Sequence, residues 1–347
     1  VKKEASSVGF DVDEWFENEL IRSAISMAGI NHLSFGPFAA GTGYNLLHQH
    51  VHGKGVFHNT QFVKGGTGEL AQVLASVAGS NNVEIRTGSK VKSIDVENGR
   101  CNGISLTGGE SIQADRIVSG LDPKNTFMNL VGTSNLNPNF HTQLNNIRYR
   151  GSTARVHFAL NKLPEINGIL KDQMKTLFSI GPSIEYQERA SDSVKYGTIA
   201  NNPTVEFTIP SLINHEFAPD GKHVLSATIQ YAPYHLRDQV WSSVLNEQLK
   251  NNVVRILDNY IPDFSSLIEA TSVLSPKDLE NEFGLTEGNL NHGEMTLDQF
   301  FFMRPTMSTA QYKSPIENLY LCGPGTHPGG GLHGANGFNA AREILKG

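Results

Sequence analysis

The last thirty residues constrain the fold of this chain more than any other segment. The apolar run Leu319–Cys322 predicts a short buried strand, the segment Gly323–Gly337 contains seven glycines, and Phe338–Leu345 has the periodicity of a helix. Glycines at this density let the backbone approach a bulky ligand closely, because no Cβ atom intervenes. The start of the following helix offers free N–H groups and a positive dipole end, which suit a phosphate or a polarised carbonyl. The segment therefore predicts a loop that faces a cofactor.

Three of these glycines, Gly329, Gly331 and Gly334, have the spacing of the dinucleotide-binding pattern G-x-G-x-x-G. That pattern requires a βαβ unit and an acidic residue about twenty positions further on, which holds the ribose. Only thirteen residues follow Gly334, so the match is coincidental. No such pattern follows a strand near the N-terminus, and the sequence begins at Val1 without an initiator methionine. We therefore expect the chain to start inside a larger protein and to lack the first βαβ unit of a dinucleotide site.

Composition places the chain among ordinary globular proteins, because 38% of its residues are hydrophobic and 18% are charged. Its length of 347 residues favours two domains. The net charge of −6 argues against a nucleic-acid partner, since no basic block would neutralise phosphates. No run of about eighteen apolar residues is present to span a membrane. The two cysteines, Cys101 and Cys322, are 221 positions apart in apolar contexts, which predicts small buried side chains and no disulfide or metal pair.

Hydrophobic periodicity and turn signals predict most of the secondary structure. The elements expected before residue 135 are a helix over 11–28, a glycine- and histidine-rich connector over 36–65, a helix that opens at 65–68 and ends at Gly79, strands over 83–86, 91–96, 101–106, 111–114 and 116–119, and a helix capped by Asp122. The dipeptide Asn98-Gly99 is typical of a two-residue hairpin turn. Strands over 153–160, 205–209 and 223–231 predict an antiparallel sheet, and a long helix is expected from Leu236 to about Tyr260.

Several segments resemble one known family. They are Lys64–Ala75, Val83–Gly88, Ala114–Ser119, Asn291–Met295, Phe302–Pro305, Tyr320–Gly323 and His327–Gly331. Together they are similar to the FAD-dependent phytoene dehydrogenase-like oxidoreductases, relatives of carotenoid desaturases and retinol saturases, and the resemblance covers nearly all of the chain. It implies an α/β fold class with an α+β substrate part. The expected architecture is an incomplete FAD/NAD(P)-binding Rossmann-like domain with an interleaved substrate domain that contains a mixed or antiparallel sheet.

The resemblance also implies where these parts begin and end. Residues 1–59 would form the helical and loop part of the substrate domain, 60–135 a segment of the FAD-binding domain, 136–314 the substrate domain, and 315–347 the C-terminal FAD-binding segment. We expect the two FAD-binding segments to pack together, with Leu319–Cys322 beside Arg116–Ser119.

A set of FAD contacts follows from the same resemblance. Val91 would lie in a strand that presents backbone to the adenine, and Ser119 and Gly120 would border the dinucleotide. The C-terminal loop would lie along the flavin and contact it through backbone atoms of Gly323, Gly331, Leu332, Gly334 and Ala335. Many relatives place an acidic residue after the glycine of the closing strand, where it binds a ribityl hydroxyl, but this chain has Pro324. The contact must be made otherwise, or the flavin is held more weakly.

Histidines are the candidates for polar groups in a substrate cavity, and the residues predicted there are His48, His50, His52 and His292. The alternation of the first three would place them on one face of a strand, an arrangement that also fits a metal site. A closed metal site needs a fourth ligand at a suitable spacing. The sequence offers none nearby, so we predict no bound metal.

Three residues are candidates for catalysis: His333, His327 and Arg304. The two histidines flank the glycine loop and could act on a substrate over the flavin as acid–base or polarising groups. Hydrogen bonding of these histidines to the loop backbone is the alternative. Arg304 could orient a polar end of the substrate or the flavin, and the alternative for Arg304 is an ion pair with Glu294 or Asp298.

The resemblance implies an FAD-dependent oxidoreductase of the desaturase or saturase type, which transfers hydride between a small, largely apolar molecule and the flavin. A flavin amine-oxidase-type enzyme and a non-catalytic binding or assembly protein are the alternatives. Because the first βαβ unit is expected to be missing, we expect this polypeptide alone to be inactive and to bind FAD weakly or not at all. We also expect self-association through the exposed edge of the nucleotide-binding part. Peripheral contact with a membrane is compatible with the sequence, and the cytoplasm is the expected compartment.

Overall fold

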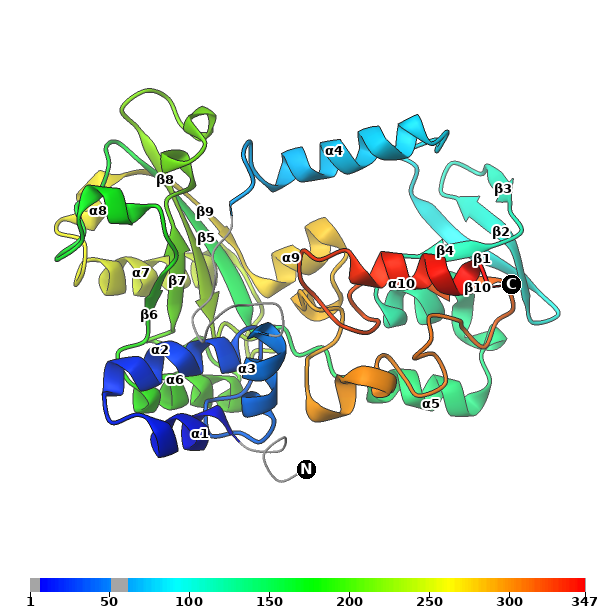
Figure 1. The fold of residues 1–347 in the computed structure, drawn as a ribbon, viewed down its shortest axis with the longest axis horizontal. Helices are drawn as coiled ribbons and strands as arrows, with labels where there is room; N and C mark the ends of the chain where they lie inside the picture. The colour runs from blue at the N-terminus through cyan, green and yellow to red at the C-terminus, as the bar shows by residue number, and fades with distance from the viewer. Residues whose placement is uncertain (1–6, 51–61, 347) are drawn as a thin grey trace. The chain divides into compact units, whose positions relative to one another are not determined.

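The computed structural model describes residues 7–50 and 62–346. The chain divides into two compact units, each made of segments that lie far apart in the sequence (Figure 1). Unit 1 comprises Val1–Ile85 and Gly151–Leu279, and unit 2 comprises Arg86–Arg150 and Glu280–Gly347. No helix among the described residues combines the length and the apolar character needed to cross a membrane.

The limits of the two units differ from the expected domain limits. Residues 60–85 belong to unit 1, and residues 136–150 and 280–314 belong to unit 2. Local contacts explain the first difference, because Gly65 donates its N–H to the Asn214 side chain at 2.7 Å and the Phe217 ring packs against Gly66. The assignment of FAD-binding and substrate-binding roles to these parts stays a prediction.

Unit 1 is built on a five-stranded antiparallel sheet with the strand order β6-β7-β8-β5-β9. Its strands are β5 (Thr153–Leu160), β6 (Phe178–Ile180), β7 (Val205–Thr208), β8 (His223–Gln230) and β9 (Ile268–Leu274). The alternation in β5 buries one face of the sheet, including Val156, Phe158 and Leu160, in the main core that α7 also joins. The antiparallel sheet predicted from the sequence is therefore confirmed, and β6 and β9 are additional strands.

The helices of unit 1 are α1 (Val8–Trp15), α2 (Glu19–Ile30), α3 (Thr42–His50), α4 (Thr67–Ser80), α6 (Ile184–Tyr196), α7 (Ser243–Leu257) and α8 (Phe264–Leu267), and α9 (Pro276–Phe283) crosses the limit between the units. The single helix expected over 11–28 is wrong, because the chain breaks between α1 and α2. Asn18 caps α2 by accepting the N–H groups of Leu20 and Ile21. The connector expected over 36–65 contains α3.

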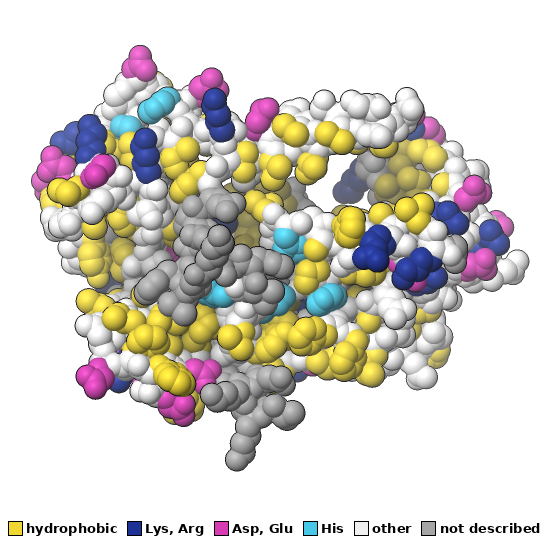
Figure 2. Space-filling model, viewed as in Figure 1, with side chains coloured by type: hydrophobic (Ala, Val, Ile, Leu, Met, Phe, Trp, Pro, Cys, Tyr) yellow, Lys and Arg dark blue, Asp and Glu magenta, His cyan; other side chains and the backbone are white. Residues whose placement is uncertain are grey.

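The apolar side chains of α4 recur at helical spacing, but Val73, Leu74 and Val77 are each more than half exposed, and Figure 2 shows hydrophobic side chains along this helix. Two predictions about a strand and a helix start in unit 1 are also wrong. The strand expected over 83–86 is not formed, because this segment pairs with no described strand. The helix expected from Leu236 begins only at Ser243, and Val240 is exposed.

Unit 2 contains two small sheets. The strands β1 (Val91–Glu97), β2 (Arg100–Leu106) and β3 (Ser111–Gln113) form an antiparallel meander, and Asn98 and Gly99 both have positive φ, as the predicted hairpin turn requires. The strands β4 (Ile117–Ser119) and β10 (Leu319–Leu321) pair in parallel. The expected contact between the two sequence-distant segments is therefore confirmed.

The longer helices of unit 2 are the π-helical segment η1 (Asn125–Gly132), α5 (Pro138–Asn146) and α10 (Ala335–Ile344). Asp122 accepts the N–H of Asn125 at 2.9 Å, which confirms its predicted capping role. Buried side chains of η1, α5 and β10 form a second core that includes Phe127, Phe140 and Leu319.

Candidate functional site

The candidate site lies at the carboxyl ends of the parallel strands β4 and β10 in unit 2. Cys322 donates its N–H to the Ser119 carbonyl at 2.9 Å, which extends the pairing by one residue. A glycine follows each strand, and a Cβ atom on Gly323 would lie 2.4 Å from the Gly120 carbonyl oxygen. Only glycine fits this approach, because no Cβ atom tolerates backbone at that distance. The two strand ends therefore form one tight backbone junction, which we call the glycine junction.

A pocket of about 930 Å³ borders the glycine junction. Val91 of β1 lines it together with Ser119 and Gly120, so the structure brings three of the predicted cofactor residues to one place. The rest of the wall is largely apolar and includes Ile94, Ile104, Ile117 and Leu130. The Ser119 hydroxyl is bonded to the Thr126 hydroxyl at 2.7 Å.

A buried asparagine fixes the first half of the C-terminal loop. The amide nitrogen of the Asn336 side chain donates to the carbonyl oxygens of Gly323 and Thr326 at 3.2 and 3.0 Å, and to the Thr326 hydroxyl at 3.1 Å. Thr326 in turn donates its hydroxyl to the Gly323 carbonyl at 2.8 Å. No sequence pattern marks Asn336, because most of its partners are backbone carbonyls of the loop.

Arg304 holds the same loop from the other side. It is completely buried, and its guanidinium donates from Nε and Nη2 to the Pro324 carbonyl at 3.0 and 2.9 Å. Nη2 also donates to the carbonyls of Asn291 and Gly293. Burial lowers the pKa of Arg304 to about 10, so the side chain stays charged at neutral pH. The structure thus places this predicted catalytic residue behind the loop, where it fixes backbone.

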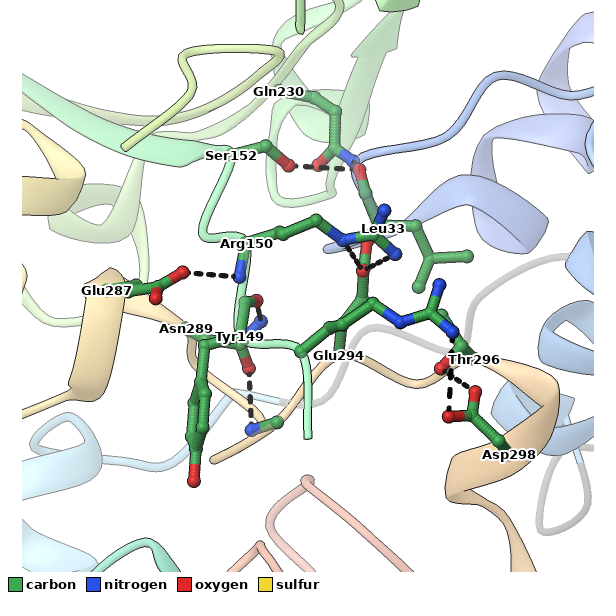
Figure 3. Close-up of polar contacts among 12 residues, drawn as sticks. Leu33, Tyr149, Arg150, Ser152, Gln230, Glu287, Asn289, Glu294, Thr296 and Asp298 are labelled. Atoms are coloured by element: carbon green, nitrogen blue, oxygen red, sulfur yellow. Dashed lines mark hydrogen bonds and ion pairs between the residues drawn. The ribbon is translucent and has the colours of Figure 1, made fainter. Parts of the chain in front are cut away.

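The ion pair considered for Arg304 is made by other arginines. Glu294 is buried and pairs with Arg150, whose Nε lies 2.6 Å from its Oε2 (Figure 3). Asp298 lies 3.8 Å from Arg148. These contacts hold the segment 287–298 in unit 2, and Figure 3 shows the Asn289 side chain in the same region donating to the Tyr149 carbonyl. Within residues 7–50 and 62–346, the hydrogen-bond partners of Arg304 are carbonyl oxygens of the backbone and of the Gln299 side chain.

The second half of the loop is exposed, in contrast to its anchored beginning. Leu332 is 80% exposed, and Gly331 and Gly334 both have positive φ. His333 accepts the Ala335 N–H at its Nδ1 at 3.0 Å, and its Nε2 lies 3.3 Å from the Gly330 carbonyl. The ring thus bonds to the loop backbone, as the alternative interpretation held. Its catalytic role stays a prediction.

The start of α10 offers hydrogen-bond donors next to this exposed loop. Phe338 makes the first intrahelical bond, to Gly334 at 3.1 Å, so the amides of Asn336 and Gly337 have no partner within the helix. Gly334 occupies the cap position and has no side chain to satisfy them. These amides and the helix dipole suit an anionic group.

His327 borders a different pocket of unit 2. This pocket, of about 510 Å³, is lined by Phe301, Phe302, Tyr312 and Arg342, and Figure 2 shows basic side chains over α10. Burial lowers the pKa of His327, and the charge of Arg304 adds to this effect. The neutral His327 ring can act as a base. The backbone carbonyl of His327 accepts a hydrogen bond from the Tyr312 hydroxyl at 2.8 Å, which fixes the position of this residue.

His292 lies under the C-terminal loop. Its Nδ1 is buried without a hydrogen-bond partner in the described structure, and a Cβ atom on Gly323 would lie 3.3 Å from it. Burial lowers the pKa of His292, Asp122 opposes this effect and Arg304 adds to it. The neutral ring therefore packs at the glycine junction, and its place in a substrate cavity stays a prediction.

We predict that the H292Q substitution makes the protein less sensitive to acid. The pKa of His292 is lower in the folded state than the ordinary value near 6.5, so the unfolded chain takes up the proton first as the pH falls. Stability should therefore fall below about pH 6.5, with a slope of at most about 1.4 kcal/mol per pH unit from this residue. Urea unfolding between pH 5 and about pH 8 should show a smaller slope for His292→Gln. Equal slopes would contradict the prediction, and comparison at about pH 8, where the ring is neutral in both states, serves as the control.

The histidines expected on one face of a strand lie elsewhere. His48 and His50 belong to α3 in unit 1, where a spacing of two places side chains on different sides of the helix, and His52 lies outside the described residues. His48 packs on Tyr44 with ring centroids 6.4 Å apart, and His50 Nδ1 bonds to the Leu46 carbonyl at 2.8 Å. Within residues 7–50 and 62–346, no group of three metal-ligating side chains is close enough to hold an ion.

Comparison with known proteins identifies the family. The profile of the flavin containing amine oxidoreductase family matches residues 33–345, and the chain belongs to this family. The match includes the glycine junction, the C-terminal loop and α10. FAD is accordingly the expected cofactor.

Individual relatives agree with this assignment. The chain is 32% identical over 96% of its length to pyridine nucleotide-disulfide oxidoreductase domain-containing protein 2 of Rattus norvegicus, and spans 60% of that protein. It is 26% identical over 87% of its length to a lycopene-forming phytoene desaturase of Paracoccus, of which it spans 57%. An oxidoreductase structure from Methanosarcina mazei matches 99% of the chain and 68% of its own length with a TM-score of 0.63 at 16% identity, which shows a shared fold. The chain thus spans about 60% of the length of the curated relatives it matches.

Proposed function

We propose that unit 2 carries part of an FAD site and that the protein is an FAD-dependent oxidoreductase of the desaturase or saturase type. The observation that carries the proposal is the glycine junction of Gly120 and Gly323, at the carboxyl ends of two parallel strands beside a pocket that Val91 lines. In open α/β sheets this edge is the usual place for a dinucleotide. Unit 2 would then be the incomplete Rossmann-like part of the protein.

The residues present fit FAD in three respects. The glycine junction permits close approach of backbone, and the first turn of α10 supplies N–H donors for a phosphate. The exposed residues Gly331, Leu332 and Gly334 and the half-buried Ala335 can contact a flat ring system. Pro324 offers only its carbonyl, and that oxygen is bonded to Arg304. Arg304 and Asn336 would therefore act as positioning residues that fix the loop. Bound FAD would supply the hydride acceptor or donor.

The substrate in this proposal is a small, largely apolar molecule, as in the desaturases among the relatives. The test uses protein loaded with FAD and measures bleaching of the flavin absorption band without oxygen. We expect an isoprenoid polyene to bleach the flavin and a primary amine to leave it oxidised. Reoxidation of photoreduced flavin by the polyene without oxygen would show the saturase direction, and bleaching by the amine alone would favour an amine oxidase. FAD binding with neither bleaching nor reoxidation by these compounds would favour a binding protein.

The exposed side chain of Val118 on β4 supports self-association through this edge, which light scattering at several protein concentrations tests.

A further inference from the structure

The pocket of about 510 Å³ that His327 borders lies beside the C-terminal half of α10. Its volume is typical of small-molecule sites, and all of its lining residues belong to unit 2. None of the residues assigned to FAD lines it. We call it the α10 pocket, and the lining residues that determine its chemistry are Phe301, Phe302, Tyr312, His327, Arg342 and Lys346.

Aromatic rings line one part of the α10 pocket. Phe301 and Phe302 are 52% and 63% exposed, and the ring centroids of Phe301 and His327 lie 5.8 Å apart. Phe301 has a φ of 51°, a left-handed conformation that is an outlier for a bulky residue and costs about 1–3 kcal/mol. Backbone strain of this kind persists where the surrounding structure enforces it, and it clusters at ligand sites. Two rings are therefore exposed in the pocket at a cost in stability.

Hydrogen bonds fix three further residues of the pocket. The Asn339 side-chain amide donates to the Tyr312 hydroxyl at 2.9 Å, and this hydroxyl donates to the His327 carbonyl at 2.8 Å. These bonds join α10 to the segment before β10 and to the C-terminal loop. A pocket held in this way is formed before a ligand arrives, which reduces the entropy lost on binding.

Arg342 is a cation of this pocket without an acidic partner. Its guanidinium carbon lies over the Phe338 ring, 5.8 Å from the centroid, and stacking through the face of the group leaves the N–H donors in its plane free. Within residues 7–50 and 62–346, no carboxylate lies within ion-pairing distance of Arg342 and no hydrogen bond uses its donors. The neighbouring Glu343 is already paired, with Lys346 at 2.8 Å and Lys313 at 3.3 Å.

The rings and the free guanidinium together define a ligand by its chemistry. A planar aromatic body can stack on the exposed rings of Phe301 and Phe302, and such pairs contribute about 0.5–1.5 kcal/mol beyond the burial of apolar area. A carboxylate on that body can accept two parallel hydrogen bonds from the Arg342 fork. A cation would be repelled by Arg342 and Lys346, and a neutral ligand would leave the fork without a partner.

We propose that the α10 pocket binds a flat aromatic molecule that carries a carboxylate group, with Arg342 binding the carboxylate and Phe302 stacking on the ring. The site is separate from the proposed FAD site, because the two share no residue. The inference therefore does not depend on the proposed function. It adds a second small-molecule site to unit 2.

The test measures binding of 2-naphthoate by titration calorimetry, with 2-naphthamide as the neutral analogue and decalin-2-carboxylate as the analogue without aromatic rings. We expect 2-naphthoate to bind most tightly. Arg342→Met should weaken 2-naphthoate binding about tenfold or more and leave 2-naphthamide binding unchanged, since only the carboxylate uses the fork. Arg342→Lys should keep part of the affinity. Arg100→Met is the matched control, because it removes an exposed arginine of unit 2 that pairs with Glu317 and should leave 2-naphthoate binding unchanged.

Phe302→Leu tests the aromatic part of the pocket, because leucine keeps an apolar side chain without a π face. It should weaken 2-naphthoate binding about threefold or more and leave decalin-2-carboxylate binding unchanged. Phe302 and Arg342 are both exposed, so these substitutions should leave the fold intact.

Equal binding of 2-naphthoate and 2-naphthamide, or unchanged 2-naphthoate binding in Arg342→Met, would overturn the inference. A titration in the presence of saturating FAD should give the same affinity, whereas displacement of 2-naphthoate by FAD would place this probe in the flavin site and refute the assignment. Binding to vesicles of phosphatidylcholine and phosphatidylglycerol without binding of 2-naphthoate would also refute it, and would assign the exposed rings and basic residues to a membrane surface. Because the titration needs neither FAD nor a reaction, its result is independent of flavin bleaching.

Discussion

Replacing Arg304 with methionine should lower the free energy of unfolding by about 3 kcal/mol or more. The guanidinium is completely buried and is a hydrogen-bond donor to the carbonyls of Pro324, Asn291 and Gly293. The methionine side chain has a similar length but no hydrogen-bond donor. Three buried carbonyl oxygens would therefore lose a partner, each at a cost of about 1–3 kcal/mol. Arg304→Lys should lose most of this stability too, because an ammonium group cannot reproduce the planar fork.

Urea unfolding followed by circular dichroism measures this effect. Arg148→Met is the matched control: it removes an arginine from the same unit whose partner, Asp298, lies 3.8 Å away and whose side chain is half exposed. Exposed pairs of this kind contribute up to about 1 kcal/mol, so the control should stay close to the unchanged protein. If Arg304→Met were no more destabilising than Arg148→Met, the loop would not depend on Arg304, and its role as a positioning residue would have to be abandoned.

The parts of this fold that the sequence predicted are those that local patterns encode. Alternation in 153–160 gave β5, the dipeptide Asn98-Gly99 gave the first hairpin, and the apolar run before the glycine loop gave β10. The parallel pairing of β4 with β10 joins segments about 200 positions apart, and it followed from the family resemblance together with the glycine pattern. These features depend on periodicity and turn chemistry, which a single sequence shows directly.

The anchors of the candidate site could not be predicted in the same way. Arg304 and Asn336 bind backbone carbonyls of a loop, and backbone acceptors leave no sequence signal. The alternation of His48 and His50 predicts a strand, whereas the chain forms a helix there. The apolar residues Val73, Leu74 and Val77 of α4 have helical spacing, and spacing alone does not decide whether a core packs against them.

The face of the unit 1 sheet that is turned away from the main core also has a sequence signal. The same alternation that buries Val156 and Phe158 requires Arg155 and His157 to share the opposite face. Their proximity to Glu206 depends on the register between β5, β8 and β7, which only the structure supplies. Sequence periodicity thus identified the faces of the strands, and pairing decided which residues meet.

The substitution Gly323→Ala should damage the glycine junction more than any other single added methyl group at this site. Its Cβ atom would lie 2.4 Å from the Gly120 carbonyl oxygen, and this neighbour is backbone that cannot rotate away. The ends of β4 and β10 would have to separate, at a cost of about 1–3 kcal/mol, as for other overpacked sites. The proposed FAD site includes both glycines, so FAD affinity should fall at least about tenfold as well.

Gly79→Ala provides the comparison, because it adds the same methyl group to α4 where no atom lies within 4 Å of the new Cβ. It should leave FAD affinity unchanged and raise stability by up to about 1 kcal/mol, as alanine does in a helix. Urea unfolding gives the stability of both variants, and quenching of FAD fluorescence gives their affinity. If the Gly323→Ala protein were as stable as the Gly79→Ala protein, the ends of β4 and β10 would be able to separate at little cost in free energy. Lower stability with unchanged FAD affinity would instead separate the junction from the cofactor site, and would place FAD away from Gly120 and Gly323.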